Sequence, residues 1–362
     1  MHESAFSYAG AGFLARSEEP ADLEWLEDFF HPAFEPVAGL REQSFTLEKN
    51  PEVLNQVRLL DSPDAERVAA FVLDSVVEEL PGRRTVLGGL TAYDAFFKVA
   101  YHREKDIRIC DAGPTGGVRR ARGACMRAIR EAAMDHVWIH GASLLHASAF
   151  AIGDRAVLVA GDKECGKTSL LCAALLQRDE AAFLSNDRVV LRREGIRCRV
   201  RPLPSIVSIR YGSARVVPSL REALFGAMEN YLGAPVSATE DPERWILSPR
   251  QFSSLLGREM RREAEVGCCL FPRIDPSEPS FQLRPLVGKE RLRRISECVF
   301  AKNHLGRRSE LFHRNEEAAF PSARELRQRV LDDLRAVPCY ELKMGVGLYQ
   351  PGGMERLIDC LS

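Results

Sequence analysis

The apolar residues of this chain form two kinds of pattern, compact runs typical of strands and spaced positions typical of helices. The clearest runs are residues 144–152 (LLHASAFAI) and 155–160 (RAVLVA), which are separated by a single Gly-Asp pair. Two apolar runs joined by a two-residue turn that contains glycine predict a β-hairpin. Residues 168–176 (TSLLCAALL) then predict a helix, because they consist mostly of good helix formers.

The first third of the chain predicts a small α+β domain. Short alternating runs predict strands at residues 43–47, 57–60, 96–101 and 107–110. Apolar residues at helical spacing predict helices at 21–30 and 64–80. The turn-rich stretch 111–117 (DAGPTGG) separates this region from the rest. The pattern therefore divides the chain into a domain of residues 1–115 and a domain of residues 116–362.

The second domain is predicted to begin and end with helices. An arginine-rich helix is expected over 118–134, with apolar positions facing inward (Val118, Cys125, Ile129 and Ala132) and arginines in water (Arg119, Arg122, Arg127 and Arg130). Further helices are predicted at 289–303 and 354–361. Between these two, Ser322 and Glu325 have the spacing of a capping box, in which the two side chains close the first turn of a helix.

Composition restricts the classes of function. The chain has 362 residues, of which 45% are hydrophobic and 28% charged, and its formal net charge is −1. These values suit a soluble globular protein and give no reason to expect a nucleic-acid or membrane partner. No signal segment is recognisable, and the apolar runs are too short to span a bilayer. The ten cysteines include no CxxC pair, which favours buried thiols in a cytoplasmic protein over disulfides or a zinc site.

Residues 161–168 (GDKECGKT) match the phosphate-loop pattern G-x4-G-K-[ST], in the required context between a predicted strand and a predicted helix. Backbone N–H groups in such a loop converge on phosphate oxygens at the positive end of the helix. Lys167 would reach the β- and γ-phosphates, and the Thr168 hydroxyl would bind Mg²⁺. The residues expected around the nucleotide are Gly161, Asp162, Lys163, Glu164, Cys165, Gly166, Lys167, Thr168 and Ser169. The predicted cofactors are ATP and Mg²⁺.

A histidine and an aspartate are predicted to meet at this loop. If Ile152 pairs with Arg155 in the hairpin, the same register sets His146 opposite Gly161. Farther along the chain, an apolar run ends just before Asp187. A carboxylate at a strand end beside a phosphate loop can hold Mg²⁺ or take the proton of an attacking hydroxyl.

With these residues in place, the second domain resembles the HPr kinase family of bacterial serine kinases. The likeness runs from His146, through the phosphate loop, to residues 185–188 (SNDR). It implies an α/β fold of HPr-kinase type, a mixed sheet with an antiparallel hairpin before the phosphate loop, preceded by a smaller α+β domain. By the same resemblance His146, Lys167 and Asp187 are catalytic, and Thr168 and Asp187 bind the metal. Asp187 would activate the hydroxyl of the acceptor.

Two departures from the family pattern narrow the expected acceptor. Asn186 stands where the family has the first of two acids, and the family segment Glu-x-Arg-Gly-x-Gly is not recognisable in residues 201–212 (RPLPSIVSIRYG). These departures speak against HPr and against a reverse, phosphate-removing reaction. The chain looks closer to divergent relatives that phosphorylate free serine or ribosomal peptides such as lasso-peptide precursors. The expected acceptor is a hydroxyl of a peptide, protein or small molecule, presented by the N-terminal domain. A homo-oligomer is a further expectation, because hexamers are known among the regulatory members.

Several alternatives remain open in the sequence. Eight arginines and a single acid lie between residues 188 and 215, and they either keep a sheet surface soluble or bind an anionic ligand. Arg273 and Arg284 are equal candidates for a clamp on the transferring phosphoryl group. The alternative to a kinase is a nucleotide-gated binding protein or ATPase that phosphorylates no substrate. A G protein is disfavoured, because the chain contains no N-K-x-D guanine motif.

Overall fold

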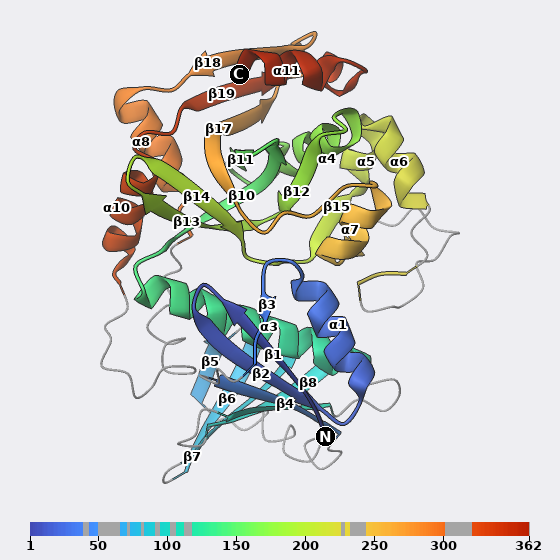
Figure 1. The fold of residues 1–362 in the computed structure, drawn as a ribbon, viewed down its shortest axis with the longest axis vertical. Coiled ribbons are helices and arrows are strands. Elements are labelled where there is room, and N and C mark those ends of the chain that lie inside the picture. The colour runs from blue at the N-terminus through green and yellow to red at the C-terminus, as the bar shows by residue number, and fades with distance from the viewer. Residues whose placement is uncertain are drawn as a thin grey trace. The chain divides into compact units, whose positions relative to one another are not determined.

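The computed structural model describes residues 1–38, 43–49, 66–70, 73–80, 83–90, 95–101, 106–111, 118–225, 229–231, 244–300 and 321–361. It has a mixed α/β architecture that divides into two compact units. The first unit comprises Met1–His140 and Lys302–Phe320, and the second comprises Gly141–Ala301 and Pro321–Ser362 (Figure 1). The first break between the units therefore falls after His140, well beyond the boundary predicted at 115.

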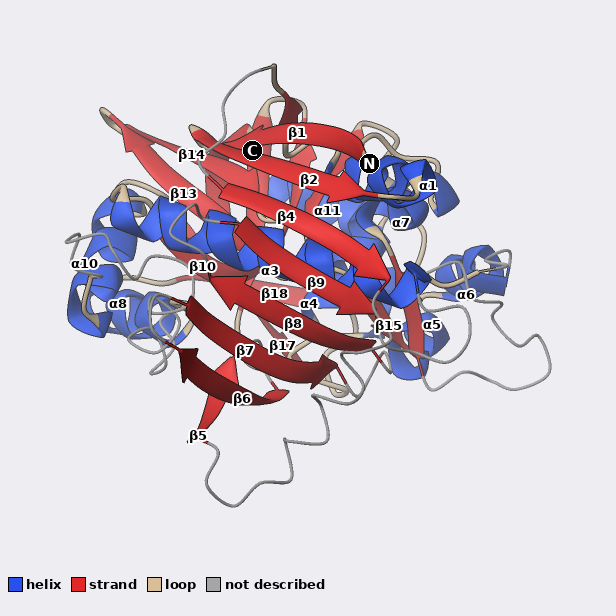
Figure 2. Cartoon of the chain, turned by 90° about the horizontal axis from the view of Figure 1, so that it is seen from below, coloured by secondary structure: helices blue, strands red, loops and turns tan. Residues whose placement is uncertain are grey.

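The first unit contains two sets of hydrogen-bonded strands. One set pairs in the order β3-β1-β2-β4-β9 and another in the order β5-β6-β7-β8. Figure 2 shows β8 beside β9, so that the second set continues the first. The strands are β1 (His2–Tyr8), β2 (Ala11–Ser17), β3 (Glu35–Pro36), β4 (Gln43–Lys49), β5 (Glu66–Ala70), β6 (Leu73–Leu80), β7 (Arg83–Leu90), β8 (Ala95–Tyr101) and β9 (Asp106–Asp111).

The structure confirms most of the predicted strands of this unit and overturns one predicted helix. Residues 43–47, 96–101 and 107–110 lie within β4, β8 and β9. The helix predicted at 64–80 is wrong, because that segment forms β5 and β6. Its valines suit a strand as well as a helix, and antiparallel pairing of β6 with β7 decides the outcome. The strand predicted at 57–60 lies outside the described residues.

Helices α1 (Pro20–Phe30) and α3 (Val118–Ile139) of this unit pack against each other. Of the positions predicted to face inward, Cys125, Ile129 and Ala132 are buried, whereas the side chains of Val118 and Arg119 are not among those described. The prediction that Arg122 and Arg130 lie in water is wrong, because they are only 8% and 5% exposed. The Arg122 guanidinium lies 4.0 Å from the Asp22 carboxylate and 5.3 Å from the Trp25 ring, and both contacts offset its burial.

The second unit contains one large mixed sheet and a small two-stranded one. Its strands are β10 (Ser143–Ile152), β11 (Arg155–Ala160), β12 (Ala181–Ser185), β13 (Arg188–Glu194), β14 (Arg197–Pro202), β15 (Val207–Arg210), β16 (Arg244–Leu247), β17 (Ala264–Ile274), β18 (Phe281–Pro285) and β19 (Cys339–Met344). The large sheet has the order β11-β10-β13-β14-β17-β19-β18, and β17 also pairs with β11. Strands β11, β10, β13, β14 and β17 thus form a closed circuit. Strands β15 and β16 pair with each other.

Strands β10 and β11 form the antiparallel hairpin that leads into the phosphate loop. Ile152 pairs with Arg155, and the ladder continues to Ala147 and Ala160. This is the register that the two-residue turn predicts. On its other side β11 runs parallel to β17, which in turn runs parallel to β19. The carboxyl ends of these three parallel strands therefore lie at one edge of the sheet, where ligands of open α/β sheets commonly bind.

Helices cover both faces of this sheet (Figure 1). They are α4 (Lys167–Gln177), α5 (Tyr211–Val216), α6 (Pro218–Phe225), α7 (Pro249–Leu255), α8 (Gly288–Glu297), α10 (Ala323–Asp333), the 3₁₀ turn η3 (Val346–Tyr349) and α11 (Gly353–Leu361). One core packs α4 to α7 and α11 against the sheet, and a second core packs α8 and α10 against it. The predicted capping box at Ser322 and Glu325 is confirmed, with both reciprocal hydrogen bonds present. The helix predicted over 289–303 ends early, at Glu297.

Candidate active site

The phosphate loop occupies residues 161–166, between the end of β11 and the start of α4. The ammonium of Lys167 donates hydrogen bonds of 2.7 Å to the carbonyl oxygens of Gly161 and Asp162. These bonds fold the lysine back over the loop, toward the first turn of α4. Thr168 is the second residue of that helix and is half-buried. A lysine ammonium, a hydroxyl and the free N–H groups of a helix start are thus gathered at one point, as phosphate binding requires.

The shape of the loop depends on glycine at both ends. Gly161 has φ +151° and Gly166 has φ +103°, values that side-chain-bearing residues rarely adopt. A Cβ atom on Gly166 would lie 2.4 Å from Cε of Met344 and 3.3 Å from Cγ1 of Ile274. A Cβ atom on Gly161 would lie 3.0 Å from Sγ of Cys165. The ends of β17 and β19 therefore pack directly on the loop and help to fix its conformation.

Glu164, at the tip of the loop, holds a left-handed conformation without being glycine. Its φ is +68°, and its carboxylate forms an ion pair with Arg210 at the end of β15. The hydrogen bond and charge of Arg210 lower the pKa of Glu164 below its ordinary value. A non-glycine residue in this region costs about 1–3 kcal/mol and is typically found at functional loops. The contact with Arg210 is a finding that the sequence pattern does not predict.

His146 and Asp187, which are far apart in the sequence, meet directly. Nε2 of His146 lies 3.0 Å from Oδ1 of Asp187, and Nε of Arg188 lies 3.2 Å from Oδ2 of the same carboxylate. The side chains of His146 and Asp187 are 42% and 36% exposed, so both remain accessible to a substrate. The last pair of the hairpin ladder is Ala147 and Ala160, which are the neighbours of His146 and Gly161 in the chain. Continuing this ladder by one position would set the backbone of His146 opposite Gly161, the first residue of the phosphate loop, as the predicted register has it.

Strand β10 is the element that brings these groups together. Its second half pairs with β12 and its first half with β13, both antiparallel, with His146 opposite Arg188. Between β12 and β13 the chain leaves the ladder at Asn186 and Asp187. The backbone of Asp187 is thus outside the regular strand pairing, and its carboxylate lies next to the imidazole of His146.

A segment after α8 completes this side of the site. The N–H of His146 donates a 2.9 Å hydrogen bond to the carbonyl oxygen of Cys298. The Arg188 guanidinium lies 4.3 Å from the ring centre of Phe300. Burial raises the pKa of Cys298 to about 12, with Lys167 acting in the opposite direction, so the thiol is neutral near pH 7. The sequence prediction placed residues 298–300 inside a helix and so missed their role beside β10.

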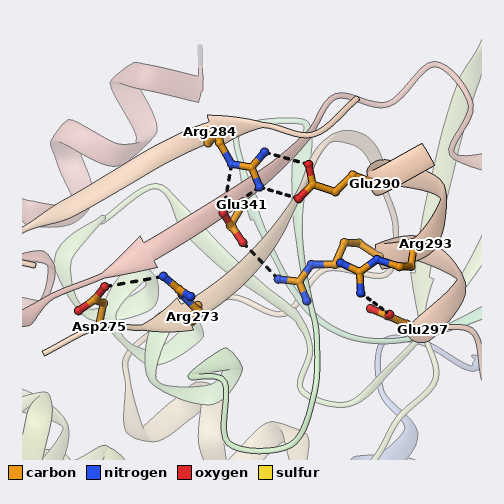
Figure 3. Close-up of polar contacts among 8 residues, drawn as sticks. Arg273, Asp275, Arg284, Glu290, Arg293, Glu297 and Glu341 are labelled. Atoms are coloured by element: carbon orange, nitrogen blue, oxygen red, sulfur yellow. Dashed lines mark hydrogen bonds and ion pairs between the residues drawn. The ribbon is translucent and has the colours of Figure 1, made fainter. Parts of the chain in front are cut away.

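The two candidate clamp arginines have different surroundings (Figure 3). Arg284 binds the carboxylates of Glu290 and Glu341 at 2.7 and 3.0 Å, and these hydrogen bonds raise its pKa further. Arg273 is 56% exposed, and its guanidinium lies 3.8 Å from the carboxylate of Asp275. Arg273 also follows Pro272, which would contact a Cβ atom on Gly161 at 3.9 Å. Of the two guanidinium groups, that of Arg273 is therefore the less tightly held by carboxylates.

Three arginines of the hairpin β13–β14 form ion pairs with nearby acids. Arg197 lies 3.4 Å from Glu265, and Arg201 lies 2.8 Å from Glu263. Arg199 lies 3.5 Å from both Glu194 and Glu263. These pairs favour the simpler of the two predicted roles, a soluble sheet surface, over a rim that binds anions.

The residues present fit a magnesium ion bound together with a nucleotide. Mg²⁺ usually takes one or two protein oxygens, completed by phosphates and water. Thr168 and Asp187 offer a hydroxyl and a carboxylate of this kind. In the described part of the chain, no group of three or more His, Cys, Asp or Glu residues could hold a metal by itself. Bound Mg²⁺ would supply charge neutralisation between the phosphate groups.

Comparison with known proteins gives little further information. No family model and no curated protein matches the chain. Among solved structures, the chain is similar to the Hpr(Ser) kinase/phosphatase from Coxiella burnetii, with 11% identity and a TM-score of 0.25, over 60% of this chain and 93% of that one. Among the described residues, no helix is both long enough and apolar enough to cross a membrane.

Proposed function

We propose that this protein is an ATP-dependent kinase that transfers the γ-phosphoryl group to an acceptor hydroxyl, with the hydroxyl of serine as the expected acceptor. The observation that supports this most directly is the 3.0 Å contact between Asp187 and His146, which lies on the first strand of the hairpin that leads into the phosphate loop. A phosphate loop alone serves many nucleotide-binding proteins. A carboxylate held at the same place adds a group that can accept the proton of an attacking alcohol.

Each residue has a distinct part in the proposed reaction. Lys167 and the N–H groups at the start of α4 would bind the β- and γ-phosphates, and Thr168 and Asp187 would hold Mg²⁺. The acceptor oxygen forms a bond to the γ-phosphorus while the bond to the bridging oxygen of ADP breaks, and the acceptor proton passes to Asp187. His146 contacts the same carboxylate and orients it. Because phosphoryl transfer needs little covalent chemistry, positioning and charge neutralisation provide most of the rate.

Arg273 is proposed to steady the γ-phosphoryl group as it moves. It lies at the carboxyl end of β17, at the edge of the sheet where the phosphate loop begins. Arg284 is not proposed for this role, because two carboxylates already bind its guanidinium.

The acceptor is proposed to be a peptide, a protein or a small molecule with a free hydroxyl, presented with the help of the first unit. The absence of the family segment Glu-x-Arg-Gly-x-Gly and the presence of Asn186 support a divergent acceptor over HPr. Ribosomal peptide precursors and free serine are therefore the first acceptors to test.

The experiment is incubation with γ-labelled ATP and Mg²⁺, followed by detection of label on candidate peptides, on serine and in free phosphate. Lys167→Ala should abolish transfer, because it removes the charge that binds the phosphates. Asp187→Asn should retain ATP binding and lose transfer by about 10²-fold or more, because an amide accepts no proton. Asp179→Asn is the matched control, since the Asp179 side chain is 99% exposed and lies beyond the end of α4 that is opposite the loop.

The alternative, an ATPase that phosphorylates no substrate, predicts a different result from the same assay. Label would then appear only in free phosphate, whatever acceptor is supplied. Transfer at the native rate by the Asp187→Asn variant would show that the assigned base is wrong, even if the protein is a kinase.

A further inference from the structure

Two buried serine hydroxyls flank the segment that carries Asp187. Oγ of Ser148 donates a 2.6 Å hydrogen bond to the carbonyl oxygen of Asn186, the residue before Asp187. Oγ of Ser185 donates a 2.7 Å hydrogen bond to the carbonyl oxygen of Arg188, the residue after it. Ser148 is fully buried and Ser185 is 3% exposed. Each hydroxyl thus holds the backbone on one side of Asp187.

These two serine hydrogen bonds lie where the pairing of β10 with β12 and β13 is interrupted. Pairing along β10 stops between Ser185 and Arg188, so the carbonyl group of Asn186 has no partner in the regular ladder. A buried carbonyl without a hydrogen bond is unfavourable, and the Ser148 hydroxyl satisfies it. The turn is consequently fixed by side chains, and its shape depends on them.

Ser148 also lies two positions after His146 on the same strand, so the two side chains point to the same face of the sheet. One strand therefore supplies both the imidazole that contacts the Asp187 carboxylate and the hydroxyl that holds the Asp187 backbone. We infer that Ser148, with Ser185, is a positioning residue that sets the Asp187 carboxylate against His146 and the phosphate loop. This inference rests on the proposed function, in which Asp187 acts on the acceptor hydroxyl.

The main test is Ser148→Ala, with Ser148→Thr as the variant that keeps the hydroxyl. Misplacement of a reacting group by about 1 Å can reduce a rate by about 10²-fold. We expect Ser148→Ala to lower kcat by about 10- to 100-fold, with the KM for ATP unchanged, and Ser148→Thr to restore at least part of the loss. Ser253→Ala is the matched control, because Ser253 is another buried serine whose hydroxyl donates to a carbonyl, that of Arg258, at the end of α7. It should leave kcat unchanged.

A double-mutant cycle separates positioning from general loss of structure. If Ser148 acts through Asp187, Ser148→Ala should cause no further loss of kcat in the Asp187→Asn background. Equal losses in both backgrounds would overturn the inference, as would an unchanged kcat in Ser148→Ala.

A crystal structure of the Ser148→Ala variant tests the inference without any activity measurement. The separation of Nε2 of His146 and Oδ1 of Asp187, 3.0 Å in the native protein, should lengthen. An unchanged separation would refute the positioning role even if the native protein proved to be an ATPase. Failure of the native protein to phosphorylate any acceptor, with a lengthened separation in the variant, would refute only the kinase proposal.

Discussion

Replacement of Gly166 by alanine should test how tightly the sheet edge fixes the phosphate loop. The φ of +103° costs an alanine about 1–3 kcal/mol of folding free energy. The new Cβ would also lie 2.4 Å from Cε of Met344, so this buried side chain, which is only 1% exposed, would have to shift within the core. Overpacking of this kind costs about 1–3 kcal/mol more. The expected loss for Gly166→Ala is therefore about 2–6 kcal/mol, accompanied by weaker ATP binding.

Gly153→Ala provides the matched control for this prediction. Gly153 also has a positive φ, +57°, but a Cβ there would meet nothing within 4 Å. Its loss should be about 1–2 kcal/mol, the ordinary cost of a left-handed conformation. The smaller entropy of the unfolded alanine chain affects both variants alike and cancels in the comparison. Urea denaturation followed by circular dichroism measures the two free energies of unfolding. Equal losses would show that Met344 and Ile274 do not restrict the loop, and the argument for a fixed loop would fail.

Two further predictions concern charged residues. Arg273→Gln should reduce phosphoryl transfer by about 10²-fold, because it removes a group proposed to stabilise charge in the transition state. Arg284→Gln should leave transfer near the native rate. A larger loss of transfer in Arg284→Gln than in Arg273→Gln, measured with labelled ATP, would show that Arg284 is the clamp. Ser322→Ala should reduce the free energy of unfolding by about 1 kcal/mol through loss of the helix cap. Because hydrogen bonds from Ser322 lower the pKa of Glu325, their contribution is present at neutral pH and is lost as the pH falls through the Glu325 pKa of the folded protein. The backbone N–H of Ser322, which donates to the Glu325 carboxylate, remains in Ser322→Ala, so Glu325→Gln is the variant that tests this contribution. The difference in free energy of unfolding between native protein and Glu325→Gln should narrow on acidification, and a constant difference from pH 7 to pH 3 would contradict the assignment.

The features that the sequence predicts well are those set by neighbouring residues. The glycine loop, the helix after it and the capping box at Ser322 depend on a few consecutive positions, and all are present. The hairpin register follows from a turn of only two residues, and the observed pairs from Ile152 and Arg155 to Ala147 and Ala160 follow it. Local chemistry thus indicates the position of the site before any tertiary structure is known.

The features that the sequence does not predict depend on partners far away in the chain. Residues 64–80 have a helical period, but pairing with β7 makes the second part of the segment a strand. Arg122 is buried because an acid on α1 lies beside it, which the periodicity of α3 cannot show. Residues 298–300 leave the predicted helix because β10 offers them hydrogen-bond partners. In each case a non-local contact outweighs the local preference of the segment.

The candidate site combines a feature set by neighbouring residues with one set by residues far apart in the chain. The phosphate loop is a local structure, and its amides and lysine would bind a nucleotide on almost any suitable fold. The contact of the acid is non-local: Asp187 meets His146 because β12 and β13 both pair with β10 and the chain between them leaves the ladder. A change confined to the loop should therefore alter nucleotide binding first, whereas a change in β10 should alter transfer with nucleotide binding retained. This difference distinguishes a kinase, which needs both parts, from a protein that only binds and hydrolyses ATP.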